Sequence, residues 1–467
     1  MRKNCLLRST LLSLTLLSLQ SCFVAKRYTR PEVVNSDYFR TDSLAQDSST
    51  LADISWRELF KDPVLVSHID NGLEQNIDIR IALQQVISAR AYFLQGKAGA
   101  FPSLNVSGRV NHQELARNSQ FGAFFDGAIT QFEITGALSW EADIWGKIRS
   151  NKRAFEASYL QSVAAHQAVK TELIAGIASL YFQLLALDEQ QRITEQTIVN
   201  RESGLATTQA LKDAGTVSEV AVKQTEAQLL SARAILVDIK TNIKLLENTL
   251  SILMGDEPHA IERSRLYDQR VDTTSLQVGV PLQLLRNRPD VIAAEYNLIN
   301  AFELTNVARS NYYPSLTLSA TSGLQSLDLD KLFSVNSLFA TVIAGIAQPV
   351  FNGRRIRTQH EVSVSQKEQA YLRFRRAILV ASREVSDALY SIQAASERIR
   401  IKSAEFAAYD IATRYSEELL NSGFANYLEV LTARQNALNS QFDLINARFN
   451  RLNSAVELYR SLGGGWK

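Results

Sequence analysis

Tyr313-Pro314-Ser315-Leu316-Thr317-Leu318-Ser319 repeats an earlier stretch of the chain, Phe101-Pro102-Ser103-Leu104-Asn105-Val106-Ser107. Further along, Glu141-Ala142-Asp143-Ile144-Trp145-Gly146-Lys147 corresponds in the same way to Gln348-Pro349-Val350-Phe351-Asn352-Gly353-Arg354. A third pair is Leu211-Lys212-Asp213-Ala214-Gly215-Thr216 and Leu419-Leu420-Asn421-Ser422-Gly423-Phe424. The copies are separated by about two hundred residues each time, which indicates one unit that occurs twice.

The composition of the 467-residue chain excludes several classes of protein. The formal net charge of +2 gives no reason to expect a nucleic-acid partner. The five histidines are scattered without metal-ligand spacing, so we expect no metal site. We find no P-loop, dinucleotide fingerprint or nucleophile elbow. The sequence therefore predicts a protein that is not an enzyme and carries no cofactor.

The N-terminus has the pattern of an export signal. Arg2 and Lys3 precede an apolar run that ends in Leu19-Gln20-Ser21-Cys22. We interpret residues 1–21 as a signal peptide and Cys22 as the acylated first residue of a lipoprotein, although glutamine is unusual two positions before such a cysteine. The alternative is ordinary signal cleavage nearby, with Cys22 an incidental thiol. Residues 22–60 are predicted to form a lipid-anchored extended segment.

The two halves are expected to contain the same elements in the same order. The first repeat is 61–254, and a linker or equatorial region at 255–281 separates it from the second repeat at 282–462, which a tail at 463–467 follows. In the first repeat we predict helices at 61–98, strands at 102–116 and 130–145, and long helices at 147–212 and 217–254. In the second we predict a helix at 282–311, strands at 314–326 and 337–351, and long helices at 354–421 and 425–462.

The predicted strands alternate between apolar and polar residues. In the second strand one face carries Phe132, Ile134, Leu138, Trp140 and Ile144, and the other carries Gln131, Glu133, Thr135, Ser139, Glu141 and Asp143. The fourth strand alternates less cleanly, because Ile343 falls on the polar face. This pattern suits either a half-buried soluble sheet or a membrane barrel with a wet lumen. Trp140 and Trp145 suit an interfacial aromatic belt or core packing.

The long helices carry apolar residues at strict seven-residue intervals. These stripes are Val222, Leu229, Leu236, Ile243 and Leu250, then Ile378, Val385, Ile392, Ile399 and Phe406, and finally Leu431, Leu438, Ile445, Leu452 and Tyr459. Such spacing keeps one seam against a neighbouring helix over the whole length, as in coiled coils. A helix over 147–212 would be about 100 Å long. A plain helical hairpin is the simpler alternative.

Four amphipathic strands in one chain cannot close into a membrane barrel. Barrels begin at about eight strands, and an open sheet leaves unpaired backbone groups in the lipid. A membrane reading therefore requires several chains, of which two would supply eight strands and three would supply twelve. The fold class predicted here is mainly α with a membrane β-barrel that continues into a barrel of helices.

Five motifs, in this order and spacing, resemble the outer membrane efflux protein family of TolC-like channels. They are Tyr28-Thr29-Arg30-Pro31, Trp56-Arg57-Glu58-Leu59-Phe60 with Asp62-Pro63, Asp143-Ile144-Trp145-Gly146-Lys147, Arg288-Pro289-Asp290, and the pair Pro102 and Pro314. The chain resembles in particular the lipoprotein branch that serves resistance-nodulation-division pumps. The resemblance implies a homotrimer in the outer membrane, with a twelve-stranded barrel and a twelve-helix periplasmic barrel. It also implies a periplasmic adaptor and an inner-membrane transporter as partners.

The resemblance also implies roles for individual residues. The helix tips would close the periplasmic end and contact the adaptor, through Asp213, Gly215, Ser218, Asn421, Gly423 and Asn426. Glu429 would line a channel constriction, with Thr432 at the next position, where relatives often have aspartate. A ring of three carboxylates would attract cations. The alternatives are a solvated helix charge at Glu429 and plain helix C-caps at the two glycines.

Three functions are compatible with this reading. The first is the exit duct of an efflux pump, and the second is the outlet of a type I protein-secretion system, which differs in its partner. The third is a lipid-anchored periplasmic coiled-coil scaffold with a small soluble sheet. An enzyme is the least favoured reading, because no nucleophile, acid–base pair or metal cluster is visible.

Overall fold

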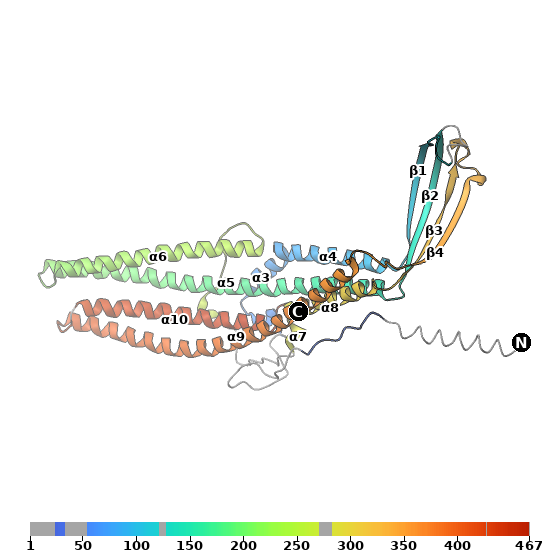
Figure 1. Cartoon of the computed structure of the whole chain (residues 1–467). Coiled ribbons are helices and arrows are strands. Elements are labelled where there is room, and N and C mark those ends of the chain that lie inside the picture. Colours follow the sequence, from blue (N-terminus) through green and yellow to red (C-terminus); the bar gives the residue numbers. More distant parts are fainter. Residues whose placement is uncertain (1–23, 33–53, 121–127, 270–282, 426, 467) are drawn as a thin grey trace. The chain divides into compact units, whose positions relative to one another are not determined.

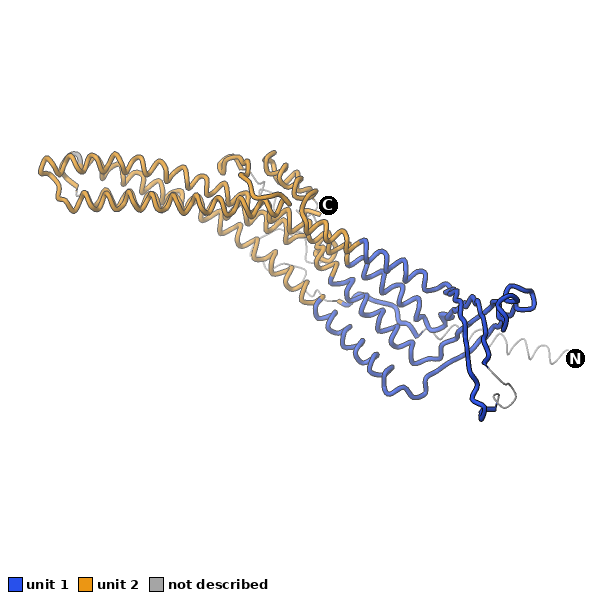
Figure 2. The backbone as a smooth tube through the Cα atoms, turned by 90° about the horizontal axis from the view of Figure 1, so that it is seen from above, with its two compact units in different colours: residues 1–31, 87–161, 294–373 blue, residues 32–86, 162–293, 374–467 orange. Residues whose placement is uncertain are grey.

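The computed structural model of the chain describes residues 24–32, 54–120, 128–269, 283–425 and 427–466 (Figure 1). The predicted signal peptide and Cys22 lie outside the described residues. The chain forms two compact units, each assembled from several segments (Figure 2). Unit 1 contains 1–31, 87–161 and 294–373, and unit 2 contains 32–86, 162–293 and 374–467.

Unit 1 contains one four-stranded antiparallel sheet. Its strands are β1 (Ser103–Glu114), β2 (Ala128–Ala142), β3 (Ser315–Ser326) and β4 (Leu338–Ala347), in the order β1-β2-β3-β4. The hairpin of the first repeat therefore joins the hairpin of the second through the β2–β3 pair. In the described chain β1 and β4 each have one free edge.

The strand register separates an apolar face from a polar face. Residues opposite one another in neighbouring strands lie on the same face. One face carries Leu104, Val106, Val110, Phe132, Ile134, Leu138, Trp140, Leu316, Leu318, Leu324, Leu338, Val342 and Ile346. The other carries Asn105, Ser107, Arg109, Glu133, Thr135, Ser139, Thr317, Ser319, Thr321 and Thr341. Ile343 stands opposite Ser319 on the polar face, as the sequence predicted.

Two strands end earlier than the predicted 130–145 and 337–351. β2 ends at Ala142 because Asp143 leaves the sheet to cap the next helix. Its carboxylate oxygens accept hydrogen bonds from the backbone N–H groups of Ile148 (2.9 Å) and Arg149 (3.0 Å). β4 ends at Ala347, shortly before Pro349, which has no N–H to donate. Ile144 therefore does not lie on the strand.

Nine α-helices are described, as Figure 1 labels where there is room. They are α2 (Trp56–Leu59), α3 (Pro63–Gln75), α4 (Ile77–Ala98), α5 (Lys147–Asp213), α6 (Glu219–Met254), α7 (Leu284–Asn287), α8 (Pro289–Ser310), α9 (Arg355–Asn421) and α10 (Tyr427–Ser461). Short 3₁₀ turns are η2 (Leu266–Asp268), η4 (Leu329–Lys331) and η5 (Val335–Ser337). The predicted segment 61–98 is two helices, because Asn76 interrupts it and accepts a hydrogen bond from the N–H of Ile79 (2.9 Å). Likewise 282–311 divides into α7 and α8 at Arg288, before Pro289.

The seven-residue stripes form much of the core of unit 2. Val222, Leu229, Ile243 and Leu250 on α6 are buried, as are Leu431, Leu438, Ile445 and Tyr459 on α10 and Ile378, Val385 and Ile392 on α9. α5 contains an 18-residue window apolar enough, by length and composition, to cross a membrane. Just over half of that window, 56%, is buried inside the protein.

The linker after α6 is held to the rest of unit 2 by buried charges. Arg263 pairs with Asp188 on α5 and with Glu247 on α6, at 2.7 Å in the second case. Burial opposes the charge on Glu247, but Arg263 and Lys244 outweigh it and lower its pKa. Burial also opposes the charge on Asp62, whose pKa is nevertheless lowered by hydrogen bonds. Those bonds are donated by Tyr181, Gln269 and Ser264 across unit 2 and by the N–H of Val64.

The C-terminal residues predicted as a tail are packed into unit 2. Gly463, Gly464 and Gly465 are buried, and the indole N–H of Trp466 donates to the carbonyl of Asn287 (2.9 Å). Gly463 has φ +91°, and an added Cβ would lie 2.4 Å from the same carbonyl oxygen. Only glycine fits this close approach.

Candidate functional site

The two helix tips of unit 2 are built alike. After α5, the N–H groups of Gly215 and Thr216 donate to Lys212 (2.8 Å) and Leu211 (2.9 Å), with Gly215 at φ +77°. The turn after α9 has the same bonds, from Gly423 and Phe424 to Leu420 and Leu419, with Gly423 at φ +79°. Both turns are Schellman caps, in which a left-handed glycine lets the last carbonyls find donors. A Cβ at either glycine would meet no atom within 4 Å, so backbone conformation alone demands glycine.

The other predicted tip residues surround these caps. Asp213 ends α5 and accepts a hydrogen bond from Gln209 (3.0 Å), and Ser218 precedes α6 without a side-chain cap bond. Asn421 is the last residue of α9, and Asn426 lies outside the described residues. The hydroxyls of Thr225 on α6 and Tyr427 on α10 lie 2.7 Å apart. This contact brings the two predicted tips together in unit 2.

Glu429 and Thr432 lie in the first two turns of α10, and both are exposed. The hydroxyl of Thr432 donates to the carbonyl of Leu428 in its own helix (2.8 Å). Glu429 has no ion pair with any described residue. An exposed, uncompensated carboxylate is available to charge a surface that faces water.

The structure shows a buried arginine near the helix tips that the sequence did not predict. Arg201 on α5 is only 4% exposed, and its guanidinium donates to the carbonyl of Gln228 on α6 and to the side chain of Gln435 on α10 (2.9 Å). Burial, and then the nearby charge of Arg434, lower the pKa of Arg201. It lines a cavity of about 660 Å³ together with Tyr427. Because arginine in a long helix normally signals a solvated face, no sequence signal marked it.

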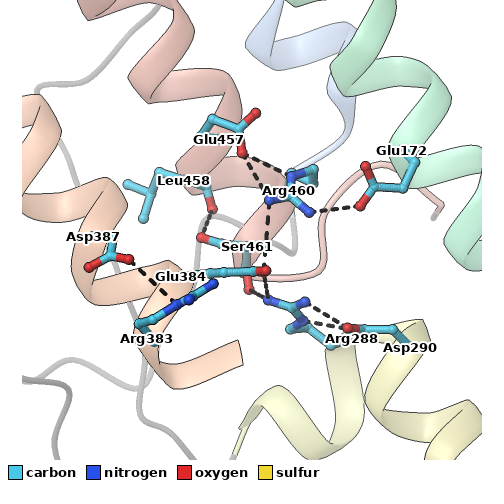
Figure 3. A network of polar contacts seen from close by, with 10 residues as sticks. All are labelled: Glu172, Arg288, Asp290, Arg383, Glu384, Asp387, Glu457, Leu458, Arg460 and Ser461. Carbon is cyan, nitrogen blue, oxygen red and sulfur yellow. Dashed lines mark hydrogen bonds and ion pairs between the residues drawn. The ribbon is translucent and has the colours of Figure 1, made fainter. Parts of the chain in front are cut away.

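The Arg288-Pro289-Asp290 motif is the centre of a polar network in unit 2 (Figure 3). Arg288 is 5% exposed and makes a bidentate pair with Asp290 (2.9 and 2.7 Å). It also donates to Glu384 on α9 (2.7 Å) and to the carbonyl of Ser461 (3.1 Å) at the end of α10. Burial opposes the charge on Arg288, but the two carboxylates outweigh it and raise its pKa.

Arg460 extends this network to α5. Its guanidinium lies 2.7 Å from Glu172, 2.9 Å from Glu457 and 3.8 Å from Glu384. Figure 3 shows Glu384 between the two arginines, so that three helices and the α7–α8 turn meet at these charges. The motif therefore fixes the packing of unit 2, and nothing in its geometry resembles a reaction centre.

The Tyr28-Thr29-Arg30-Pro31 motif lies against α8 in unit 1. Arg30 makes a bidentate pair with Glu295 (2.6 and 2.7 Å), and Asn306 exchanges two hydrogen bonds with the backbone of Lys26 (3.1 and 2.9 Å). Tyr28 packs edge-on against Phe302, and burial, followed by the charge of Glu295, raises its pKa. The motif attaches the segment that follows Cys22.

The residues that the structure describes contain no group of three or more His, Cys, Asp or Glu side chains that could hold a metal ion. The geometry supplies two helix tips, an exposed carboxylate on α10 and a sheet with one polar face. The polar face of the sheet suits contact with water.

The comparisons with known proteins agree with this description. A family model described as outer membrane efflux protein matches residues 68–256 and 280–464. The solvent efflux pump outer membrane protein SrpC of Pseudomonas putida is 30% identical over 412 residues, which cover 88% of this chain and 87% of SrpC. The probable outer membrane lipoprotein SilC of Salmonella typhimurium is 28% identical over 466 residues, with 97% and 99% covered. A crystal structure of CusC superposes with a TM-score of 0.83 at 26% identity, over 94% of this chain and 99% of that one. The chain therefore belongs to the outer membrane efflux protein family and has the TolC-like fold of its channels.

Proposed function

We propose that this chain is one of three identical protomers of a passive outer-membrane exit duct. The duct receives substrates from an inner-membrane transporter, through a periplasmic adaptor, and releases them outside the cell. The observation that carries the proposal is a sheet with one apolar face, one polar face and two free edges. In a bilayer those edges must be paired, and four strands from each of three chains would make a closed twelve-stranded barrel.

Exposed apolar stripes on the helices support assembly from several copies. On α6 the residues opposite the buried stripe are also apolar, and Leu230, Val237, Leu245 and Ile252 are all more than half exposed in the single chain. Spacings of seven and eight residues keep such a stripe on one side of a helix. We assign this side of α6 to a neighbouring protomer.

The tips and α10 form the proposed periplasmic end of the duct. The turns at 213–218 and 421–426 would contact the adaptor. Glu429 would contribute one carboxylate per protomer to a constriction, with Thr432 beside it. Three carboxylates around one axis repel anions and attract cations, so the constriction would favour cations.

Cys22 is the proposed site of lipid attachment. The supporting observation is that Lys26 and Arg30, soon after this cysteine, are held on α8. Such anchoring requires only a few residues between the lipid and the folded unit. The anchor would retain each protomer at the membrane while the barrel assembles.

Efflux is favoured over the outlet of a type I secretion system by the names of the relatives. SrpC is a solvent efflux pump protein, and CusC relatives are named as cation efflux system proteins. The scaffold reading is not favoured, because a soluble sheet would cover its apolar face, whereas Leu104, Val106, Val110, Val342 and Ile346 are all more than 60% exposed in the single chain. The relatives are named for different substrates, solvents for SrpC and cations for CusC.

The test is the mass and single-channel conductance of the protein purified from outer membranes in mild detergent. We expect a trimer that conducts weakly, and more strongly after Glu429→Ala. Glu418→Ala, which removes an exposed carboxylate from α9, is the matched control and should leave the conductance unchanged. A trimer whose conductance is unchanged by Glu429→Ala would show that Glu429 does not line the constriction. A soluble monomer without conductance would disprove the duct.

A further inference from the structure

The duplication gives unit 1 two junctions between strands and helices, and one of them is closed inside the chain. Where β2 passes into α5, the ring of Trp145 stacks on Tyr313, which precedes β3, with 4.9 Å between centroids. The indole N–H of Trp145 also donates to the carbonyl of Pro314 (2.7 Å). The exit from the second strand of a hairpin thus packs against the entry to the next hairpin.

The corresponding turn between β4 and α9 exposes its apolar side chains to solvent in the single chain. Val350 is 98% exposed and Phe351 is 93% exposed. The counterpart of Tyr313-Pro314 is Phe101-Pro102, at the entry to β1, and Phe101 is 73% exposed. Large apolar side chains that lie fully in water at a folded turn mark a contact surface.

The turn between β4 and α9 also differs from the turn between β2 and α5 in its sequence and in its backbone conformation. Asp143, which caps α5, corresponds to Val350, so a capping carboxylate is replaced by an apolar side chain. Gly353 (φ +60°) is followed by Arg354 at φ +68°, where arginine is disfavoured. Two successive left-handed residues thus shape the turn that presents Phe351.

The two exposed apolar segments, Val350-Phe351 and Phe101-Pro102, lie at the same end of the sheet. The register places Ser103, the first residue of β1, level with Ser139, Ser319 and Ile343, and β4 ends four residues after Ile343. Beside Phe101 is a cavity of about 820 Å³, lined also by Gly96, Trp140 and Phe155. This space is large enough for an aromatic ring.

We infer that Val350 and Phe351 of one protomer pack against Phe101 and Pro102 of the next, in the cavity beside Phe101. The occupant is a second copy of this chain, because β4 and β1 carry the two free edges and meet only between copies. The contact would lie at the same kind of junction as the one that Trp145 and Tyr313 close within one chain, but through Phe351, the counterpart of Ile144, since Asn352 stands in the place of Trp145. It rests on the proposed trimer, and it is head-to-tail, so three copies close the ring.

The test is site-directed crosslinking in the full-length chain, isolated in outer membranes. Phe351→Cys combined with Phe101→Cys, treated with a short bis-maleimide, should give covalent dimers and trimers on a denaturing gel. Each single variant and the unchanged chain, which retains Cys22, should give none, because like residues do not meet. Phe351→Cys combined with Phe333→Cys is the matched control, since Phe333 is 75% exposed between β3 and β4, at the other end of the sheet.

The outcomes separate this contact from the duct itself. A trimer by mass that does not crosslink through Phe351→Cys and Phe101→Cys overturns the contact and leaves the duct intact. Dimers from Phe351→Cys alone overturn it too, since they place two equivalent turns together. A monomer by mass disproves both. As a second measurement, Phe351→Asp should abolish the trimer band in detergent, while Phe333→Asp should retain it.

Discussion

Replacing Arg288 by methionine tests what holds unit 2 together. The guanidinium is 5% exposed and satisfies Asp290, Glu384 and the carbonyl of Ser461 at once. Removing one partner of a buried ion pair typically costs about 3–5 kcal/mol. Asp290 is 47% exposed and can be hydrated, which places the loss toward the lower end, about 3 kcal/mol.

The assay is guanidinium unfolding of the purified protein, followed by tryptophan fluorescence. Trp466 donates to Asn287, next to Arg288, and so reports on this region. Arg400→Met is the control, because Arg400 is 74% exposed in its pair with Glu397 and a solvent-exposed ion pair contributes little to stability. Adding Glu384→Gln to Arg288→Met should recover part of the loss, since it removes a largely buried charge that has lost its closer partner and keeps only Arg460, at 3.8 Å. Equal losses for Arg288→Met and Arg400→Met would refute this reasoning.

Three further predictions concern unit 2. Folding lowers the pKa values of Glu247 and Asp62 below their ordinary 4.5 and 3.8. Both carboxylates therefore stabilise the fold above their ordinary pKa values, and this stabilisation is lost as the pH falls through their lowered pKa values in the folded state. Glu247→Gln should make the free energy of unfolding depend less on pH in this acidic range, and an unchanged dependence would contradict this. Gly215→Ala and Gly423→Ala should each cost about 1 kcal/mol in unfolding, through φ alone, and a cost near zero would show that the cap relaxes. Trp466→Phe replaces the indole by a smaller ring and removes the N–H that donates to Asn287, so it should cost at least about 1 kcal/mol, and no measurable loss would contradict this reasoning.

The periodic parts of the fold were predictable from the sequence. A period of two fixes which residues share a sheet face, so even Ile343 was assigned to the correct side. A period of seven identified the buried seam, including Leu250 and Ile445. These patterns are local, and each repeats many times along its element.

Single contacts between distant segments were not predictable. The packing of Trp466 on Asn287 and the burial of Arg201 depend on partners far away in sequence, with no period to mark them. Asp143 was predicted to lie on the strand at 130–145, because the sequence does not show that its side chain caps the next helix. Glu429 and Cys22 remain predictions, since their proposed roles need two more protomers or a lipid.

The joining of the two hairpins sets the order in which the sheet can form. β1 and β2 are adjacent in the chain, and so are β3 and β4, but Ala142 meets Leu316 only after α5, α6 and α8 have been synthesised. Closing a loop of that length is slow compared with forming a hairpin. Until β3 is available, the edge of β2 that faces β3 therefore stays unpaired, although β2 already pairs with β1. An unpaired strand edge can pair with another chain, so this interval is when the first hairpin is most exposed to aggregation.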